Sequence, residues 1–214
     1  MGYSLKKVIT VVEYIREVFN ETLELYTKIT SPPPLGLRII PKERHHKTIK
    51  SSPFTQELVQ TGLITNLTEA PTYGVVYKLD THIINIPLTG KLWIGICLEN
   101  ALYTLNKLNN KQQRLHLIHV FAHEISHIVE HDIVKKFPYI QEKAIEASSR
   151  YEYGRVKELM YHESIADQTS YLLVPEGVVK EINLLLYDDI LTKYVNKEKE
   201  GAYGMGIISN NRIT

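Results

Sequence analysis

The stretch Arg114–Ile133 reads RLHLIHVFAHEISHIVEHDI, and its pattern constrains how the rest of the chain can be arranged. Apolar residues recur in it at three- and four-residue intervals, which predicts one helix from Lys111 to about Lys135. Several histidines and acidic residues interrupt the apolar ones, and these would be very costly in lipid. We therefore expect a helix that is buried inside a folded domain rather than in a membrane.

The centre of this helix contains the pattern HExxH, formed by His123-Glu124-Ile125-Ser126-His127. Residues four apart on a helix are separated by about 40° and about 6 Å of rise, so both imidazoles project from one face. Imidazole nitrogens at about 2.0 Å suit a tetrahedral zinc ion. Glu124 leaves the helix at a different angle, which favours a role as general base on the attacking water over direct ligation.

A third protein ligand is expected because a catalytic zinc usually has three protein ligands and one open position. The predicted third ligand is Glu163, which lies 36 residues after His127 on a second expected helix. Asp167 lies one turn further on, where it could accept the distal ring N–H of a ligand histidine. Glu130 and Asp132 remain alternatives to Glu163.

Other histidines continue the row, but they fit a metal site less well. From His123 to His131 the helix rises about 12 Å, which is too far for His123, His127 and His131 to meet at one ion. His116, His119 and His131 are therefore predicted to be structural or surface residues.

Length and composition favour a single domain that covers residues 1–214. The chain has 43% apolar residues and a net charge of +1, so its charge gives no reason to expect direct nucleic-acid or membrane binding. Residues 1–20 mix charged with apolar residues, so no signal-peptide core is expected. Cys97 is the only cysteine, which fits a reducing compartment, and we expect a cytoplasmic protein. Its oligomeric state is left open.

The order of the expected elements predicts an α+β fold with a small antiparallel sheet and an active-site helix that carries HExxH. Five segments are expected: an N-terminal packing helix (1–30), a loop (31–53), strands (70–98), a helical part with the zinc site (99–196) and a flexible tail (197–214). The strands are expected at Tyr73–Leu79, His82–Ile86 and Leu92–Leu98. The helices are expected at Leu5–Ile29, Phe54–Thr61, Glu99–Leu108, Lys111–Lys135, Pro138–Tyr153, Arg155–Leu173 and Pro175–Asn196.

The motif set resembles that of the ImmA/IrrE metallopeptidases. HExxH is followed by Glu163-Ser164-Ile165-Ala166-Asp167 and by the segment Leu172–Glu176, and the likeness covers roughly Arg114–Glu181. It implies a helical zincin-type core and a gluzincin-like site, in which His123, His127 and Glu163 match the ligands and Glu124 the catalytic glutamate. Members act inside cells on DNA-binding repressors, which implies a protein or peptide substrate of that class. Ser126 stands where the family usually has glycine.

These observations predict a zinc metalloendopeptidase that hydrolyses a peptide bond with zinc-activated water and Glu124 as general base. Substrate is expected to lie along an edge strand between Tyr73 and Leu98. Candidate donors to the oxyanion are Tyr77, Tyr161, His162 and Tyr171. Two alternatives remain: a non-catalytic regulatory binding protein with a zincin fold, and a deformylase-like hydrolase with Cys97 as a ligand beside the two histidines.

Overall fold

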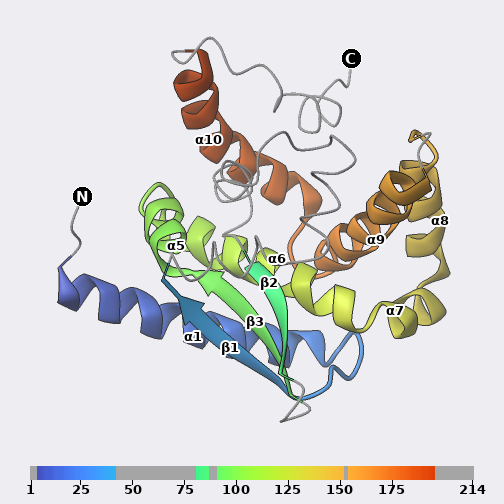
Figure 1. The fold of residues 1–214 in the computed structure, drawn as a ribbon, viewed down its shortest axis with the longest axis horizontal. Coiled ribbons are helices and arrows are strands. Elements are labelled where there is room, and N and C mark those ends of the chain that lie inside the picture. The colour runs from blue at the N-terminus through green and yellow to red at the C-terminus, as the bar shows by residue number, and fades with distance from the viewer. Residues whose placement is uncertain (1–3, 42–80, 87–90, 152–153, 196–214) are drawn as a thin grey trace.

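A computed structural model describes residues 4–41, 81–86, 91–151 and 154–195 of the chain. Most of this part is helical, and a three-stranded sheet lies against the helices (Figure 1). Strands in the first half and helices in the second are compatible with the predicted α+β class. The expected helix at Phe54–Thr61, the expected strand at Tyr73–Leu79 and the expected tail lie outside the described residues.

The first helix, α1 (Leu5–Tyr26), packs one face against the rest of the molecule, as predicted. Ser4 caps it, because its side chain accepts a hydrogen bond from the backbone N–H of Lys7. The ring of Phe19 contacts the ring of Phe121 edge to face, with 5.2 Å between centroids. The buried residues follow helical spacing: Ile15, Val18, Phe19, Thr22 and Tyr26.

The sheet differs in part from the expected antiparallel one. It consists of β1 (Leu35–Ile40), β2 (Thr81–Ile86) and β3 (Lys91–Cys97) in the order β1-β3-β2. The β2–β3 pair is antiparallel, but β1 runs parallel to β3. The prediction of an antiparallel sheet was thus wrong for one of its two strand pairs. A parallel pair needs a long crossover connection, and here residues 41–90 separate the two strands.

Strand β1 lies in the segment 31–53 that was predicted as a loop, so that prediction was wrong for these six residues. Arg38 made the segment look like the start of a basic surface loop. In the structure Arg38 is exposed on the strand and its guanidinium lies 4.8 Å from the centroid of the Trp93 ring. Leu35 and Ile40 are buried. Gly36 faces Trp93, and a Cβ there would lie 2.7 Å from Cδ2 of the indole.

The helical half follows the predicted order with one additional break. The long helix expected from Lys111 to Lys135 is divided at Val129, whose φ of −115° and ψ of 21° are not helical. Val129 is buried, and it both ends one helix and begins the next. The helices are α5 (Leu98–Leu105), α6 (Asn110–Ile128), α7 (Glu130–Lys136), α8 (Pro138–Ser148), α9 (Gly154–Ser170) and α10 (Glu176–Val195).

Helix α6 lies at the centre of the described structure, in contact with α1, β2, α9 and α10 (Figure 1). Its fully buried residues Leu117, Phe121 and Ile125 belong to the main apolar core, together with Ile94 and Ile96 of β3. Within the described residues, no helix combines the length and the apolar composition that crossing a membrane requires. The contacts with α1, β2, α9 and α10 hold α6 from several sides and fix the side chains that it carries.

Candidate metal centre

A capping box starts helix α6 at a defined residue. The side chain of Asn109 accepts from the backbone N–H of Gln112 at 3.0 Å, and the backbone N–H of Asn109 donates to the Gln112 side chain at 3.1 Å. From this start the helix runs to Ile128 and carries His123, Glu124 and His127 near its end. His123 and Glu124 are buried, and His127 is partly buried.

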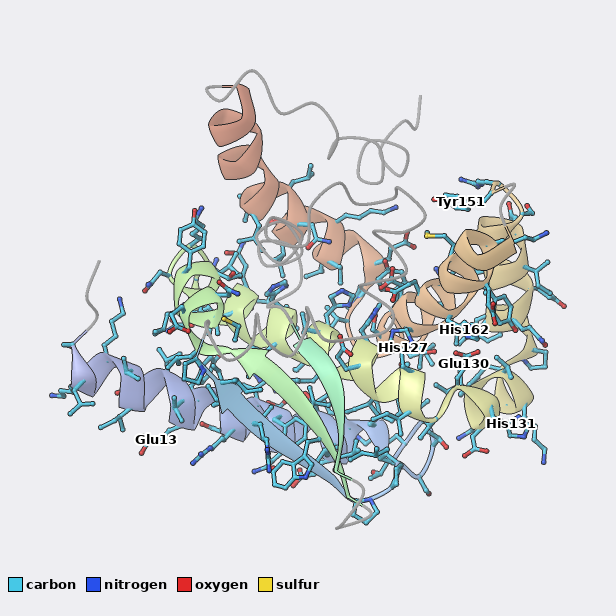
Figure 2. The ribbon with its side chains drawn as sticks, in the orientation of Figure 1. Glu13, His127, Glu130, His131, Tyr151 and His162 are labelled. Atoms are coloured by element: carbon cyan, nitrogen blue, oxygen red, sulfur yellow. The ribbon has the colours of Figure 1, made fainter. Side chains whose placement is uncertain are left out.

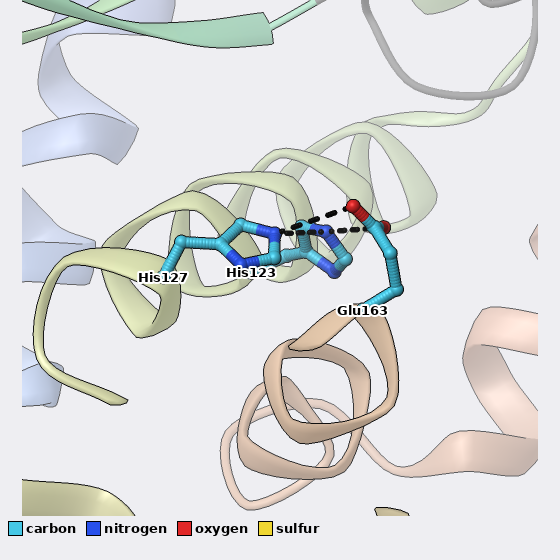
Figure 3. A group of neighbouring side chains, drawn as sticks. All are labelled: His123, His127 and Glu163. Atoms are coloured by element: carbon cyan, nitrogen blue, oxygen red, sulfur yellow. Dashed lines mark hydrogen bonds and ion pairs between the residues drawn. The ribbon is translucent and has the colours of Figure 1, made fainter. Parts of the chain in front are cut away.

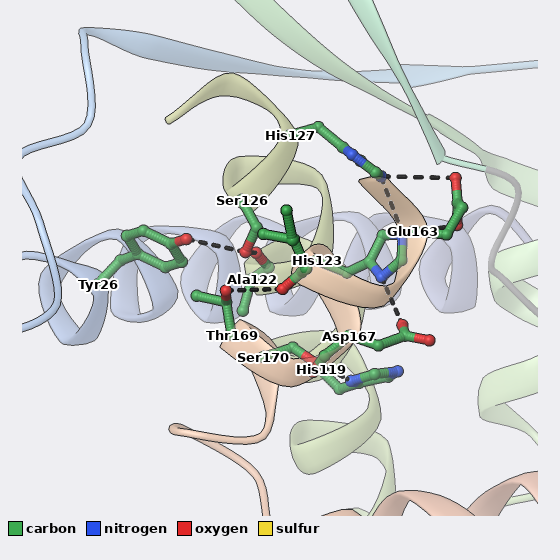
Figure 4. Close-up of polar contacts among 11 residues, drawn as sticks. Tyr26, His119, Ala122, His123, Ser126, His127, Glu163, Asp167, Thr169 and Ser170 are labelled. Carbon is green, nitrogen blue, oxygen red and sulfur yellow. Dashed lines mark hydrogen bonds and ion pairs between the residues drawn. The ribbon is translucent and has the colours of Figure 1, made fainter. Parts of the chain in front are cut away.

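Helix α9 lies against α6 and runs antiparallel to it. Polar side chains of the two helices form a series of contacts along their length (Figure 4). His119 Nδ1 lies 2.8 Å from Ser170 Oγ, and His123 Nδ1 lies 2.7 Å from Asp167 Oδ1. His127 Nε2 lies 3.6 Å from Glu163 Oε1. Residue numbers rise on α6 as they fall on α9, so each turn of one helix faces one turn of the other.

Two histidines and one glutamate converge at a point on this interface (Figure 3). Their ligand atoms all lie within 4.8 Å of one another. The two Nε2 atoms are 3.1 Å apart, and Glu163 Oε2 is 3.3 Å from Nε2 of His123. A tetrahedral ion with bonds of about 2.0–2.1 Å holds its ligand atoms about 3.3 Å apart. The group His123, His127 and Glu163 therefore has the spacing of a site that can bind a metal ion.

Asp167 orients one of these histidines. Its carboxylate can only accept a hydrogen bond when ionised, so Nδ1 of His123 carries the hydrogen and donates it. In the neutral ring Nε2 then presents a lone pair, and this is the atom that faces His127 and Glu163. A carboxylate behind a ligand histidine is a common arrangement in metal sites, where it fixes the tautomer and ring orientation.

A neighbouring face of α6 is held by a buried hydrogen bond to α1 (Figure 4). Ser126 donates to the backbone oxygen of Ala122 at 2.6 Å, and the Tyr26 hydroxyl lies 2.8 Å from Ser126 Oγ. Burial raises the pKa of Tyr26, so its hydroxyl stays protonated and can donate to Ser126. Because Ser126 lies between the two histidines in sequence, this contact fixes the turn of helix that carries them.

The remaining candidates for the metal site lie elsewhere. Cys97 is buried at the end of β3, where its Sγ contacts Glu99 Oε2 at 3.8 Å, and it is not a member of the ligand group. Glu130 binds His162, with Nδ1 2.8 Å from each carboxylate oxygen. Asp132 and His131 are exposed on α7. Among the described residues the third member of the group is Glu163.

Two polar contacts of the site were not expected from the sequence. The Glu130–His162 pair depends on the break between α6 and α7 at Val129. No glycine or proline at this position predicts that break from the sequence. The Tyr26–Ser126 contact joins residues 100 positions apart. The only sequence signal for it is a hydroxyl at Ser126, the position at which the resembled family usually has glycine.

His116 and His119 have structural surroundings, as predicted. His119 contacts Ser170 and stacks on Tyr171, with 6.0 Å between ring centroids and 8° between ring planes. His116 is buried, and its Nε2 has no hydrogen-bond partner among the described residues. Burial, and to a lesser extent the neighbouring His119, lowers the pKa of His116 to about 3.

No family model, no curated protein and no solved structure matches the chain. The resemblance to ImmA/IrrE metallopeptidases therefore stays a prediction from the motifs. Any functional conclusion depends on the residues at the centre itself.

The surroundings of His116 predict how stability depends on pH. When pH falls below the ordinary histidine pKa of 6.5, the unfolded chain binds a proton that folded His116 does not bind until about pH 3. Stability is therefore lost as pH falls, and at this site the loss between pH 7 and pH 5 is about 2 kcal/mol. In urea titrations, His116→Leu should gain about that much relative to wild type over this range. Parallel stability curves for the two proteins would contradict the assignment.

Asp167 should strengthen metal binding without contacting the ion. We expect Asp167→Ala to weaken zinc affinity by roughly 10- to 100-fold, because His123 loses the group that fixes its tautomer. Competition with a chromophoric chelator measures this change. Asp167→Asn keeps an acceptor for the Nδ1 hydrogen and should lose less. Equal affinities of Asp167→Ala and wild type would show that His123 needs no such support.

Proposed function

We propose that this protein is a zinc-dependent metalloendopeptidase of the ImmA/IrrE type. One observation carries the proposal: His123, His127 and Glu163 form a group with metal-site spacing, and Glu124 of the same HExxH pattern is buried immediately beside His123. A structural metal site would gain nothing from this glutamate, because it has no position among the ligands.

The ligand types favour zinc. Two imidazoles and one carboxylate match the protein ligands of many catalytic zinc sites, which leave one coordination position open for water or substrate. A bound zinc ion would supply Lewis acidity, which polarises the scissile carbonyl and makes water a better nucleophile. Calcium and magnesium prefer sites made of oxygen atoms, so two nitrogen ligands count against them.

In the proposed reaction the chain's own residues hold the parts and move one proton. His123, His127 and Glu163 would hold the ion, and Asp167 keeps the His123 ring in the orientation that it needs. Glu124 accepts the proton of the attacking water and then passes it to the nitrogen of the leaving amine. Water adds to the carbonyl carbon, the C–N bond breaks, and the products are a carboxylate and an amine.

Strand β2 offers a place for the substrate backbone. It is at the edge of the described sheet, it pairs with β3 alone among the described strands, and it contacts α6. An extended peptide could add to such an edge through main-chain hydrogen bonds, which would bring a peptide bond alongside the helix that carries HExxH. We propose a protein substrate that is cleaved in an extended segment, and a DNA-binding repressor is the class that the motif resemblance suggests.

Replacing Glu124 by Gln tests the proposal. Zinc-loaded wild type should cleave a proteome-derived peptide library, with products identified by mass spectrometry. Glu124→Gln should cleave it about 10²- to 10⁴-fold more slowly, since it lacks the proton acceptor. Its zinc content should be unchanged, because the amide replaces no ligand. No cleavage by folded, zinc-loaded wild type would favour a non-catalytic binding protein, and equal cleavage by both proteins would remove Glu124 from the reaction.

A further inference from the structure

A histidine–glutamate pair lies next to the ligand group. His162 Nδ1 is 2.8 Å from both carboxylate oxygens of Glu130. Glu130 follows His127 by three residues, and His162 immediately precedes Glu163. Figure 2 labels the pair, which joins the start of α7 to α9. The pair is thus a contact between α7 and α9 that follows the α6–α9 series after His127 and Glu163.

The contact leaves one nitrogen of His162 available for another molecule. A carboxylate accepts hydrogen bonds, so Nδ1 of His162 is protonated and donates to Glu130. Nε2 is on the other side of the ring, and the side chain is 43% exposed. The edge of the ring also contacts Tyr161, at 5.4 Å between centroids. Glu130 and Tyr161 therefore hold the ring in one orientation while part of the His162 side chain stays exposed.

Other polar groups that could reach a substrate are engaged in different contacts. Gln141 of α8 donates to the hydroxyl of Tyr161 at 3.2 Å. The ring of Tyr171 stacks on His119, one turn of α6 before His123 and away from Glu163. Tyr77 lies outside the described residues. Among the described candidates, His162 is the one that a carboxylate positions directly beside a member of the ligand group.

We propose that His162 is a substrate-contacting residue of the metal centre and that Glu130 is its positioning residue. The Cα atoms of His162 and Glu163 are about 3.8 Å apart, and an extended peptide advances about 3.3 Å per residue. Adjacent residues of a helix project about 100° apart, so His162 leaves α9 beside Glu163, and its Nε2 would meet the main chain of a substrate residue near the scissile bond. The inference depends on the proposed peptidase function, and it adds a residue that HExxH and its third ligand do not include.

The test compares two inhibitors of the zinc-loaded protein. A phosphinic pseudopeptide occupies the metal centre and carries substrate main chain on both sides, whereas acetohydroxamate contacts little beyond the metal. His162→Phe should weaken pseudopeptide binding roughly 3- to 10-fold, because one hydrogen bond to the peptide main chain is lost. Acetohydroxamate affinity and zinc content should stay within about twofold of wild type. His131→Phe makes the same change at an exposed position of α7 and should bind both inhibitors as wild type does.

Substitutions at Glu130 test the positioning role. Glu130→Gln keeps an oxygen that accepts from Nδ1, so it should retain most of the pseudopeptide affinity, whereas Glu130→Ala should resemble His162→Phe. Equal pseudopeptide affinity in His162→Phe and wild type would overturn the inference. An equal loss of affinity for both inhibitors would also overturn the inference, because His162 would then act on the metal ligands instead of on the substrate. Failure of wild type to bind zinc would instead reject the proposed function.

Discussion

The antiparallel contact between α6 and α9 is the constraint on which the site depends. A ligand group made from two helices requires that their turns face one another in one register. Three contacts set that register, from His119 with Ser170 through His123 with Asp167 to His127 with Glu163. A shift of one helix by a single residue would rotate its side chains by about 100° and separate the ligand atoms. The apolar packing of α6 on α1 and the sheet holds this register from behind.

The electrostatics of the group favour a bound cation. Two ring nitrogens 3.1 Å apart and a carboxylate within 3.6 Å bring lone pairs and negative charge together in a partly buried place. Such an arrangement is costly unless protons or a metal ion compensate it. Asp167 adds to the cost, since it fixes the Nδ1–H tautomer of His123 and so directs the Nε2 lone pair inward. A bound cation would therefore stabilise the ligand group in the arrangement that the fold imposes.

The sequence predicted the parts of this structure that depend on local spacing. HExxH placed two histidines on one helical face, and the Glu163–Asp167 pair lay one turn apart on a second helix. The three members of the ligand group and Asp167, which contacts His123, were therefore named in advance. Parts that depend on distant contacts were missed. Strand β1 was predicted as a loop because its partner β3 lies more than 50 residues away. Arg38 also interrupts the run of apolar residues in this strand. The Glu130–His162 contact depends on the break at Val129, a residue type that does not usually end a helix.

Metal content of purified protein tests the account most directly. Wild type, Glu163→Ala and Glu158→Ala would be dialysed identically and their zinc measured by elemental analysis; Glu158 is an exposed glutamate on the same helix and serves as the matched control. We expect about one zinc per chain in wild type and in Glu158→Ala, and a sharp loss in Glu163→Ala, because catalytic zinc needs its third protein ligand. Equal zinc in all three proteins, or none in folded wild type supplied with zinc, would contradict the account.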